Sequence, residues 1–389
     1  MSDLSPPPPP PASGQPFPDG RRPAARKTGC LLPLTLISLF VSVLANLFLC
    51  FLLIRDVTSP SDDESSLQER FLLGDRDASD KVAVIRIEGL ISEYNMAFPI
   101  HQMEKAARDR HVKVVVLRVD SPGGTVTASE ELYQCLINLR DDTGRRFKGT
   151  GPKPLSVSMG GLAASGGYYV AMAGKPISAE RTTITGSIGV FAALPNVSKL
   201  AHDHGVRVEL VKAGDVKGSG SFFHDMTPQE RQTWQDTVDN AYDTFLGVVA
   251  SGRPLTKEQL RTDVVIDTMI PVRDEKGNPE TKPDGKPLIA KYTRTRADGG
   301  TFTADQALRF KLIDTVEDLP ATIRTAAAGL GKYKAVTYDR SPGILDLLVG
   351  GRASAHPDIP DLRTLTSQLT PRLWYLGPTS DGIILASGQ

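Results

Sequence analysis

The middle of the chain alternates short apolar runs with more polar segments. Apolar runs of the kind that form buried strands lie at 82–90, 112–119, 155–159 and 206–211. Nearly continuous apolar runs are typical of strands covered on both faces of a parallel sheet. A helical segment is predicted at 129–140, between the second and third runs. Strands alternating with helices predict an α/β layered fold with a mostly parallel sheet.

A long helix is predicted after the fourth run. Thr227 is a suitable N-cap, Pro228 suits the first helical position, and Glu230 completes a capping box. Its buried stripe is predicted to consist of Trp234, Val238, Tyr242, Phe245 and Val249. Gly252 ends the helix.

The segment 273–296 breaks this pattern. Asn278-Pro279 and Asp284-Gly285 are turn signals inside a charged stretch. We therefore expect an inserted hairpin, exposed to water as charge-rich segments usually are.

The most hydrophobic segment precedes the folded region. Residues 31–54 contain no charged side chain and, at about 1.5 Å per residue, are long enough for a helix to cross a bilayer. Basic residues precede this segment and acidic residues follow Arg55, so the positive-inside rule places the N-terminus in the cytoplasm. The following domain is then on the extracytoplasmic, periplasmic side. A cleaved signal peptide is the alternative, but the run is long and lacks a small-residue cleavage site.

These patterns divide the chain into successive parts. They are a proline-rich cytoplasmic tail at 1–30, a transmembrane helix at 31–54, a tether at 55–80, a folded domain at 81–331 carrying the 273–296 hairpin, and a C-terminal tail at 332–389.

Composition excludes several classes of function. Forty-five Lys and Arg balance 45 Asp and Glu, so the basic excess of a nucleic-acid binder is missing. Three cysteines cannot build a disulfide framework. No Cys or His cluster has metal-ligand spacing, and we expect neither a metal nor another cofactor.

Two glycine-rich turns follow predicted strands. They are Asp120-Ser121-Pro122-Gly123-Gly124 and the segment 160–169. Glycines at such places bring backbone N–H groups close to a ligand. Neither turn has the spacing of a dinucleotide-binding or phosphate-binding loop, which disfavours nucleotide binding.

Ser165 is the candidate nucleophile in the second turn. It is a lone hydroxyl among Ala and Gly residues, at the start of an apolar segment. A following helix N-terminus would favour the oxyanion formed when a serine attacks a carbonyl. The alternative is that Ser165 only caps that helix.

A nucleophilic serine needs a base. None of the six histidines is marked by its sequence context, although sequence distance does not exclude a triad. Lys217, just beyond 206–211, can serve if burial keeps its amine neutral. Taken alone, it is equally compatible with a solvated loop lysine.

Four motifs occur together and in order: Ser121-Pro122-Gly123-Gly124, 163–169, 185–190 and 212–217. In this combination the chain closely resembles the SppA-type signal-peptide peptidases, membrane-bound serine–lysine proteases. The resemblance covers roughly 81–330, with a weaker echo near 373–376, and fits the short single-domain form of that family.

The resemblance implies a ClpP/crotonase-like fold and a role for each matching residue. Ser165 is the expected nucleophile, Lys217 the general base, and Ser187 the residue that orients the lysine amine. The backbone N–H groups of Gly124 and Gly166 form the expected oxyanion hole. The expected substrates are signal peptides and other short apolar peptides, with no cofactor.

The resemblance also implies a homo-oligomer, ring-like or dome-like, whose neighbouring chains help to build each site. One departure is Gly218, which follows Lys217 where relatives commonly have an acidic residue. A catalytically silent scaffold and a crotonase-like acyl-CoA enzyme are the alternatives. The intact Ser165 and Lys217 argue against the first, and the predicted membrane span argues against the second.

Overall fold

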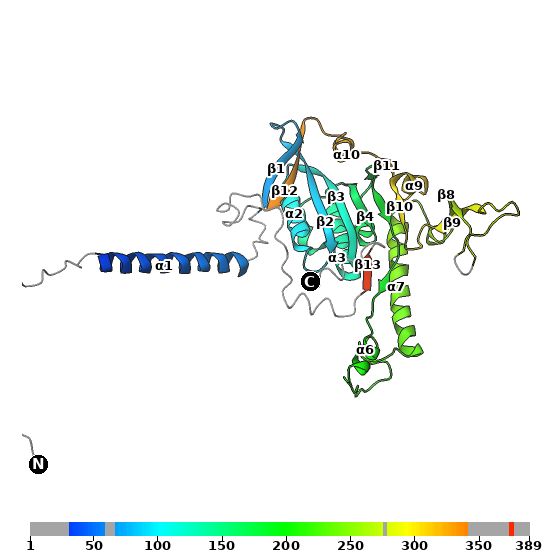
Figure 1. Ribbon diagram of the computed structural model, residues 1–389. Helices are drawn as coiled ribbons and strands as arrows, with labels where there is room; N and C mark the ends of the chain where they lie inside the picture. Colours follow the sequence, from blue (N-terminus) through cyan, green and yellow to red (C-terminus); the bar gives the residue numbers. More distant parts are fainter. Residues whose placement is uncertain (1–30, 59–66, 275–277, 341–372, 377–389) are drawn as a thin grey trace, which may run out of the picture. The chain divides into compact units, whose positions relative to one another are not determined.

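The computed structural model describes residues 31–58, 67–274, 278–340 and 373–376 (Figure 1). Contacts divide the chain into two units, Met1–Ser59 and Pro60–Gln389. The predicted tail at 1–30 and most of 332–389 lie outside the described residues.

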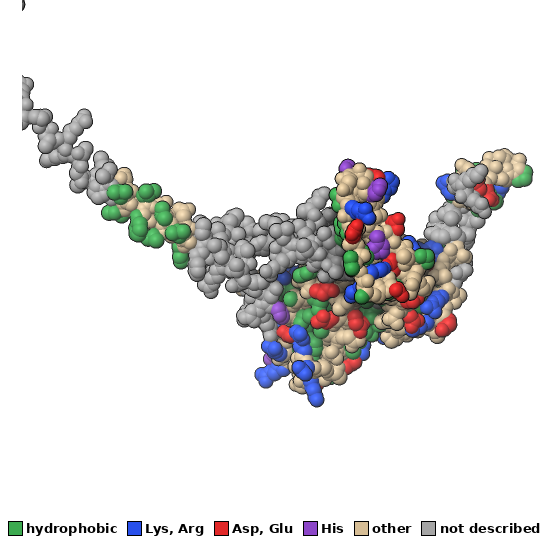
Figure 2. Space-filling model, turned by 90° about the horizontal axis from the view of Figure 1, so that it is seen from below, with side chains coloured by type: hydrophobic (Ala, Val, Ile, Leu, Met, Phe, Trp, Pro, Cys, Tyr) green, Lys and Arg blue, Asp and Glu red, His purple; other side chains and the backbone are tan. Residues whose placement is uncertain are grey.

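The first unit contains one helix, α1 (Leu31–Thr58), over the predicted apolar segment. Among the α1 side chains that the structure describes, the large apolar ones are exposed, Phe40 at 65% and Phe48 at 63%. Hydrophobic side chains are coloured green on this helix in Figure 2. No helix in the described part of the chain meets the combined length and hydropathy needed to cross a membrane.

The second unit is built on a mixed sheet whose central strands are parallel, which confirms the mostly parallel α/β fold. Its main order is β1-β12-β2-β3-β4-β5-β11, and only β1 runs antiparallel to its neighbour on this path. The bounds are β1 Leu67–Gly74, β2 Asp80–Ile91, β3 Val112–Thr125, β4 Leu155–Ala164, β5 Ile177–Ala179, β11 Thr315–Val316 and β12 Tyr333–Arg340.

Helices cover both faces of this sheet. Alternate residues of β2 point to opposite sides: Ile85 belongs to the large core cluster, whereas Val84 packs in a smaller cluster with Ile323 of α10. The helices are α2 Ala97–Arg108, α3 Val126–Asp141, α4 Gly144–Phe147, α5 Gly166–Ala171, α6 Ser198–Asp203, α7 Pro228–Gly252, α8 Lys257–Leu260, α9 Ala304–Arg309 and α10 Leu319–Ala326. Burial on both faces explains why the strands are continuously apolar in sequence.

Two strands at one end of the sheet lie outside the predicted folded domain. β1 falls within the predicted tether, and β12 falls within the predicted C-terminal tail. The two pair with each other, and β12 extends the sheet beside β2. The folded region therefore begins before 81 and continues past 331.

The long helix α7 begins and ends as predicted. Thr227 caps it, the reciprocal capping box with Glu230 forms, and the last helical residue is Gly252. The predicted stripe is fully buried only toward the C-terminus, at Phe245 and Val249, while Trp234 is partly exposed. The reason is that the N-terminal half of α7 projects away from the sheet (Figure 1).

The projecting end of α7 carries an arm, residues 193–227, that includes α6. The predicted strand at 206–211 is wrong. These residues form no strand, and Val211 is 96% exposed. Their alternating apolar pattern has no partner strand within the described part of this chain.

A two-stranded hairpin overlaps the predicted insertion at 273–296. β8 (Asp263–Pro271) and β9 (Ile289–Thr295) form a separate two-stranded antiparallel sheet. Isolated bridges continue the pairing at Arg273 with Pro279 and Thr281 with Pro287. The hairpin begins about ten residues before the predicted start because its first strand precedes the charged segment.

Candidate active site

Ser165 lies on a strained turn between β4 and α5. Its backbone has φ 55° and ψ −116°, a conformation that costs a non-glycine residue free energy. Its N–H donates to Gly186 O at 2.8 Å, which ties the turn to β6 (Ile184–Gly186). The Ser165 side chain makes no cap hydrogen bond, so the simple capping role is not what the structure shows. Its Oγ is buried and has no hydrogen-bond partner among the described residues.

Gly124 and Gly166 lie together beside this turn. A Cβ atom built on Gly166 would lie 3.0 Å from Gly124 N, and one built on Gly124 would lie 1.6 Å from Ile91 O. Both positions therefore exclude a side chain. Their backbone amides come from different elements, the end of β3 and the start of α5. This arrangement can present two N–H donors beside a serine, as an oxyanion hole requires.

Ser187 follows β6, which pairs with β4 next to Ser165. Its N–H donates to Gly300 O at 2.9 Å, and its Oγ donates to Gly299 O at 2.9 Å. The hydroxyl proton is thus committed, while the oxygen lone pairs can still accept a hydrogen bond from an amine. That is the capacity expected of a residue that orients a lysine.

Lys217 is not brought to Ser165 within one chain. It is an exposed residue of the arm, and its N–H donates to Gly214 O at 3.2 Å. The arm packs at Glu230, which is about 22 Å along α7 from Phe245 at 1.5 Å per residue. Phe245 contacts Tyr169, whose N–H bonds to Ser165 O. Ser165 and Lys217 therefore lie near opposite ends of α7, and neither is part of that helix.

The arm is held by a buried carboxylate. The Glu230 side chain is fully buried, and it accepts hydrogen bonds from Thr227 N at 2.9 Å and Lys212 Nζ at 3.2 Å. The Thr227 N–H first, and then Lys212, lower the pKa of Glu230 below its usual value. The carboxylate is therefore kept charged where the arm joins α7.

His224 lies beside Gly218, the residue after Lys217. Its two ring nitrogens lie 2.8 Å from Asp225 O and Gly218 O, which raises its pKa because only the protonated ring donates to both. A Cβ on Gly218 would lie 3.0 Å from His224 Nε2 and 2.5 Å from Leu210 Cδ2. Both atoms are the ends of flexible side chains, so a residue larger than glycine at 218 would need the Leu210 and His224 side chains to shift. Figure 2 shows histidine, basic and acidic side chains mixed on this projecting lobe.

A short strand near the C-terminal end of the chain pairs with the glycines at the end of β3. β13 (Leu373–Leu376) pairs antiparallel with Gly123–Thr125 on one side and with β7 (Phe191–Ala192) on the other. Tyr375 stands opposite Gly124. The weak similarity near 373–376 was the only sequence signal for this strand. An extended segment of the same chain therefore pairs with the backbone beside the candidate oxyanion hole.

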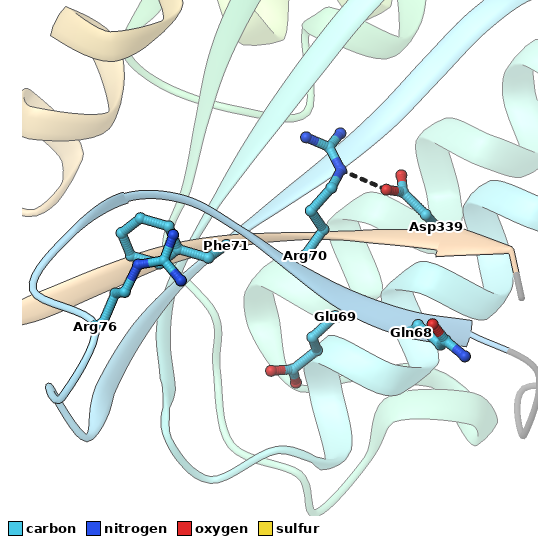
Figure 3. Close-up of a pocket in the computed structure, with 6 residues that line it drawn as sticks. All are labelled: Gln68, Glu69, Arg70, Phe71, Arg76 and Asp339. Atoms are coloured by element: carbon cyan, nitrogen blue, oxygen red, sulfur yellow. Dashed lines mark hydrogen bonds and ion pairs between the residues drawn. The ribbon is translucent and has the colours of Figure 1, made fainter. Parts of the chain in front are cut away.

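Two cavities lie away from these residues. One of about 500 Å³ lies at the β1–β12 edge, where Arg70 pairs with Asp339 at 2.5 Å (Figure 3). Another of about 280 Å³ lies on the arm, next to His224. Within the described ranges no group of His, Cys, Asp or Glu is arranged to hold a metal ion.

Comparison with known proteins decides the family. The family model described as "Peptidase family S49" matches residues 149–264. This range includes Ser165, Gly166, Ser187 and Lys217. The putative protease slr0021 of Synechocystis sp. is 33% identical over 276 residues, 70% of this chain and 83% of that protein. The chain belongs to peptidase family S49.

Other members of family S49 match over shorter stretches. Protease 4 of Haemophilus influenzae is 35% identical over 187 residues, 46% of this chain but only 29% of that protein. The putative signal peptide peptidase SppA of Enterococcus faecium is 32% identical over 185 residues, 44% of this chain and 51% of that protein. These matches confirm the SppA-type resemblance, while this chain spans well under two thirds of the length of both relatives.

Proposed function

We propose that this S49 family member is a serine endopeptidase that uses Ser165 as nucleophile and Lys217 as general base. The observation that carries the proposal is the Ser165 hydroxyl, which is buried on a strained turn beside the amides of Gly124 and Gly166 and has no hydrogen-bond partner in the described part of the chain. Strain and an unpaired polar atom at one residue are characteristic of a reacting group rather than a structural one.

Lys217 acts on Ser165 of a neighbouring copy in this proposal. The arm that carries Lys217 projects from its own domain, so it is available to reach another one. The arm also exposes many large apolar side chains, namely Leu200, Val206, Val208, Leu210, Val211 and Phe223. Exposed apolar clusters of this kind mark protein interfaces. A homo-oligomer in which each arm packs on the next copy buries these side chains.

The same contact would activate the lysine. An amine serves as a base only when it is neutral, and burial favours the neutral form. Placed on a neighbouring copy, Lys217 would leave water and meet the oxygen lone pairs of Ser187. The amine then takes the Ser165 proton as Oγ attacks the peptide carbonyl, and it returns that proton to the leaving amine. Water next hydrolyses the acyl-enzyme, with the lysine again taking and returning one proton.

The substrates in this proposal are signal peptides and other short apolar peptides, bound as an extended strand. The place that β13 takes between β3 and β7 supports this binding mode, since a peptide in that position would cross Gly124. We further propose that α1 anchors the chain in the membrane with the N-terminus in the cytoplasm. The uncharged run at 31–54 and the basic residues before it support this topology.

The β13 strand competes with substrate if this binding mode is right. Tyr375→Pro removes a backbone N–H and disfavours pairing opposite Gly124. We expect KM for a short apolar peptide to fall several-fold with kcat unchanged, measured by steady-state kinetics on the full chain. Tyr375→Phe keeps the backbone N–H and should behave as wild type. An unchanged KM in Tyr375→Pro would show that β13 does not occupy the substrate position.

The function itself is tested with the detergent-solubilised full chain. We expect turnover of an apolar peptide, no turnover of an acyl-CoA thioester, and labelling of the protein by a fluorophosphonate. Thioester turnover without peptide turnover would identify a crotonase-like enzyme. Absence of both turnover and labelling would identify a catalytically silent member of the fold.

A further inference from the structure

A second serine without a hydrogen-bond partner lies beside Ser165. Ser129 of α3 is fully buried, and its Oγ has no partner among the described residues. A buried hydroxyl that has lost water and gained no partner costs free energy. Such groups are uncommon in folded proteins, and each one requires an explanation. Two such hydroxyls at one site, on Ser129 and Ser165, suggest that their hydrogen-bonding capacity is used by a group that exists only during the reaction.

The Ser129 hydroxyl lies against Gly166, at the point where Gly166 also approaches the backbone nitrogen of Gly124. A Cβ on Gly166 would lie 2.4 Å from Ser129 Oγ and 3.0 Å from Gly124 N. Ser129 Oγ and Gly124 N therefore both lie close to the space that a side chain on Gly166 would fill. Side chains on a helix lean toward its N-terminus, and α3 begins directly after Gly124 and Thr125. Ser129 thus leans toward the end of α3 at which the glycines lie.

The helix that carries Ser129 is fixed to the nucleophile's helix. Tyr169 of α5 donates a hydrogen bond to Glu130, the neighbour of Ser129. The rings of Tyr133 and Tyr169 pack edge to face with centroids 5.4 Å apart. Thr125 Oγ1 caps α3 by accepting from Ala128 N at 3.2 Å. The backbone of α3 at Ser129 is therefore held beside α5 before any substrate binds.

We propose that Ser129 Oγ donates a third hydrogen bond to the oxyanion that forms when Ser165 attacks the substrate carbonyl. This assignment rests on the proposed peptidase function. The hydroxyl has no hydrogen-bond partner among the described residues, and it gains a charged acceptor in the tetrahedral intermediate. A contact made only there lowers the barrier without tightening substrate binding. The Ser129 proton stays on its oxygen throughout.

The test is Ser129→Ala in the full chain. We expect kcat for a peptide to fall on the order of 100-fold with little change in KM. Affinity for a peptide boronate, which forms a tetrahedral adduct with Ser165, should fall by a similar factor. The melting temperature should stay the same or rise, because the variant loses a buried hydroxyl that has no partner. If Ser129 were needed only for packing, the variant would have a lower melting temperature and an unchanged kcat.

Ser178→Ala is the matched control. Ser178 is also fully buried, but its Oγ donates to Glu317 at 2.7 Å, so its loss should lower the melting temperature and leave kcat unchanged. For Ser129→Ala, kcat within about threefold of wild type, or a lowered melting temperature, would overturn the assignment. Wild-type protein that neither cleaves peptide nor binds the boronate would overturn the proposed function, and this assignment with it.

Discussion

Ser165→Ala is expected to lower peptide cleavage by at least about 10⁴-fold and to abolish fluorophosphonate labelling. The reason is that the variant keeps the glycine amides but loses the atom that forms the acyl-enzyme. The fold should survive, since Ser165 Oγ holds no hydrogen bond among the described residues. Active-site labelling and steady-state cleavage on the same preparation measure the loss.

Ser158→Ala is the control on the strand that precedes Ser165. Ser158 is fully buried in β4, and its Oγ accepts from Arg118 at 3.1 Å. Its loss should reduce stability and leave labelling intact. If Ser165→Ala were still labelled at the wild-type rate, another side chain would be the nucleophile.

Lys217→Ala is expected to reduce cleavage by a similarly large factor while the protein still assembles. Without a neutral amine near it, the Ser165 hydroxyl keeps its proton and is a weak nucleophile. Lys199→Ala is the control, because Lys199 is also an exposed arm lysine, paired only with Asp203 at 2.6 Å in the described structure. It should retain wild-type kcat. Equal activity of Lys217→Ala and Lys199→Ala would remove Lys217 from the mechanism.

The parallel core of the fold could be predicted from sequence because its strands are buried on both faces. Continuous apolar runs mark β2, β3 and β4, and the capping box at Thr227 marks α7. β1 and β12 carry a weaker signal, because charged residues interrupt the apolar positions of both strands. The sequence therefore predicts a tether over β1 and a tail over β12.

The candidate site was predictable only in part. Glycine-rich turns after strands pointed to Ser165, Gly124 and Gly166, which the structure places together. The strand predicted at 206–211 does not form in the described structure. An alternating pattern of apolar residues shows which side chains suit burial in a sheet, but it does not show that a partner strand is present. Ser129 carries no local signal, since its importance arises only from the packing of α3 against α5.

Co-expression of Ser165→Ala with Lys217→Ala tests most directly whether neighbouring copies share each site. Neither variant alone can supply both groups, but a mixed oligomer can join the intact serine of one copy to the intact lysine of the next. If copies mix at random, about one quarter of wild-type activity should return. Mixed oligomers that remain inactive would contradict a dyad built between copies.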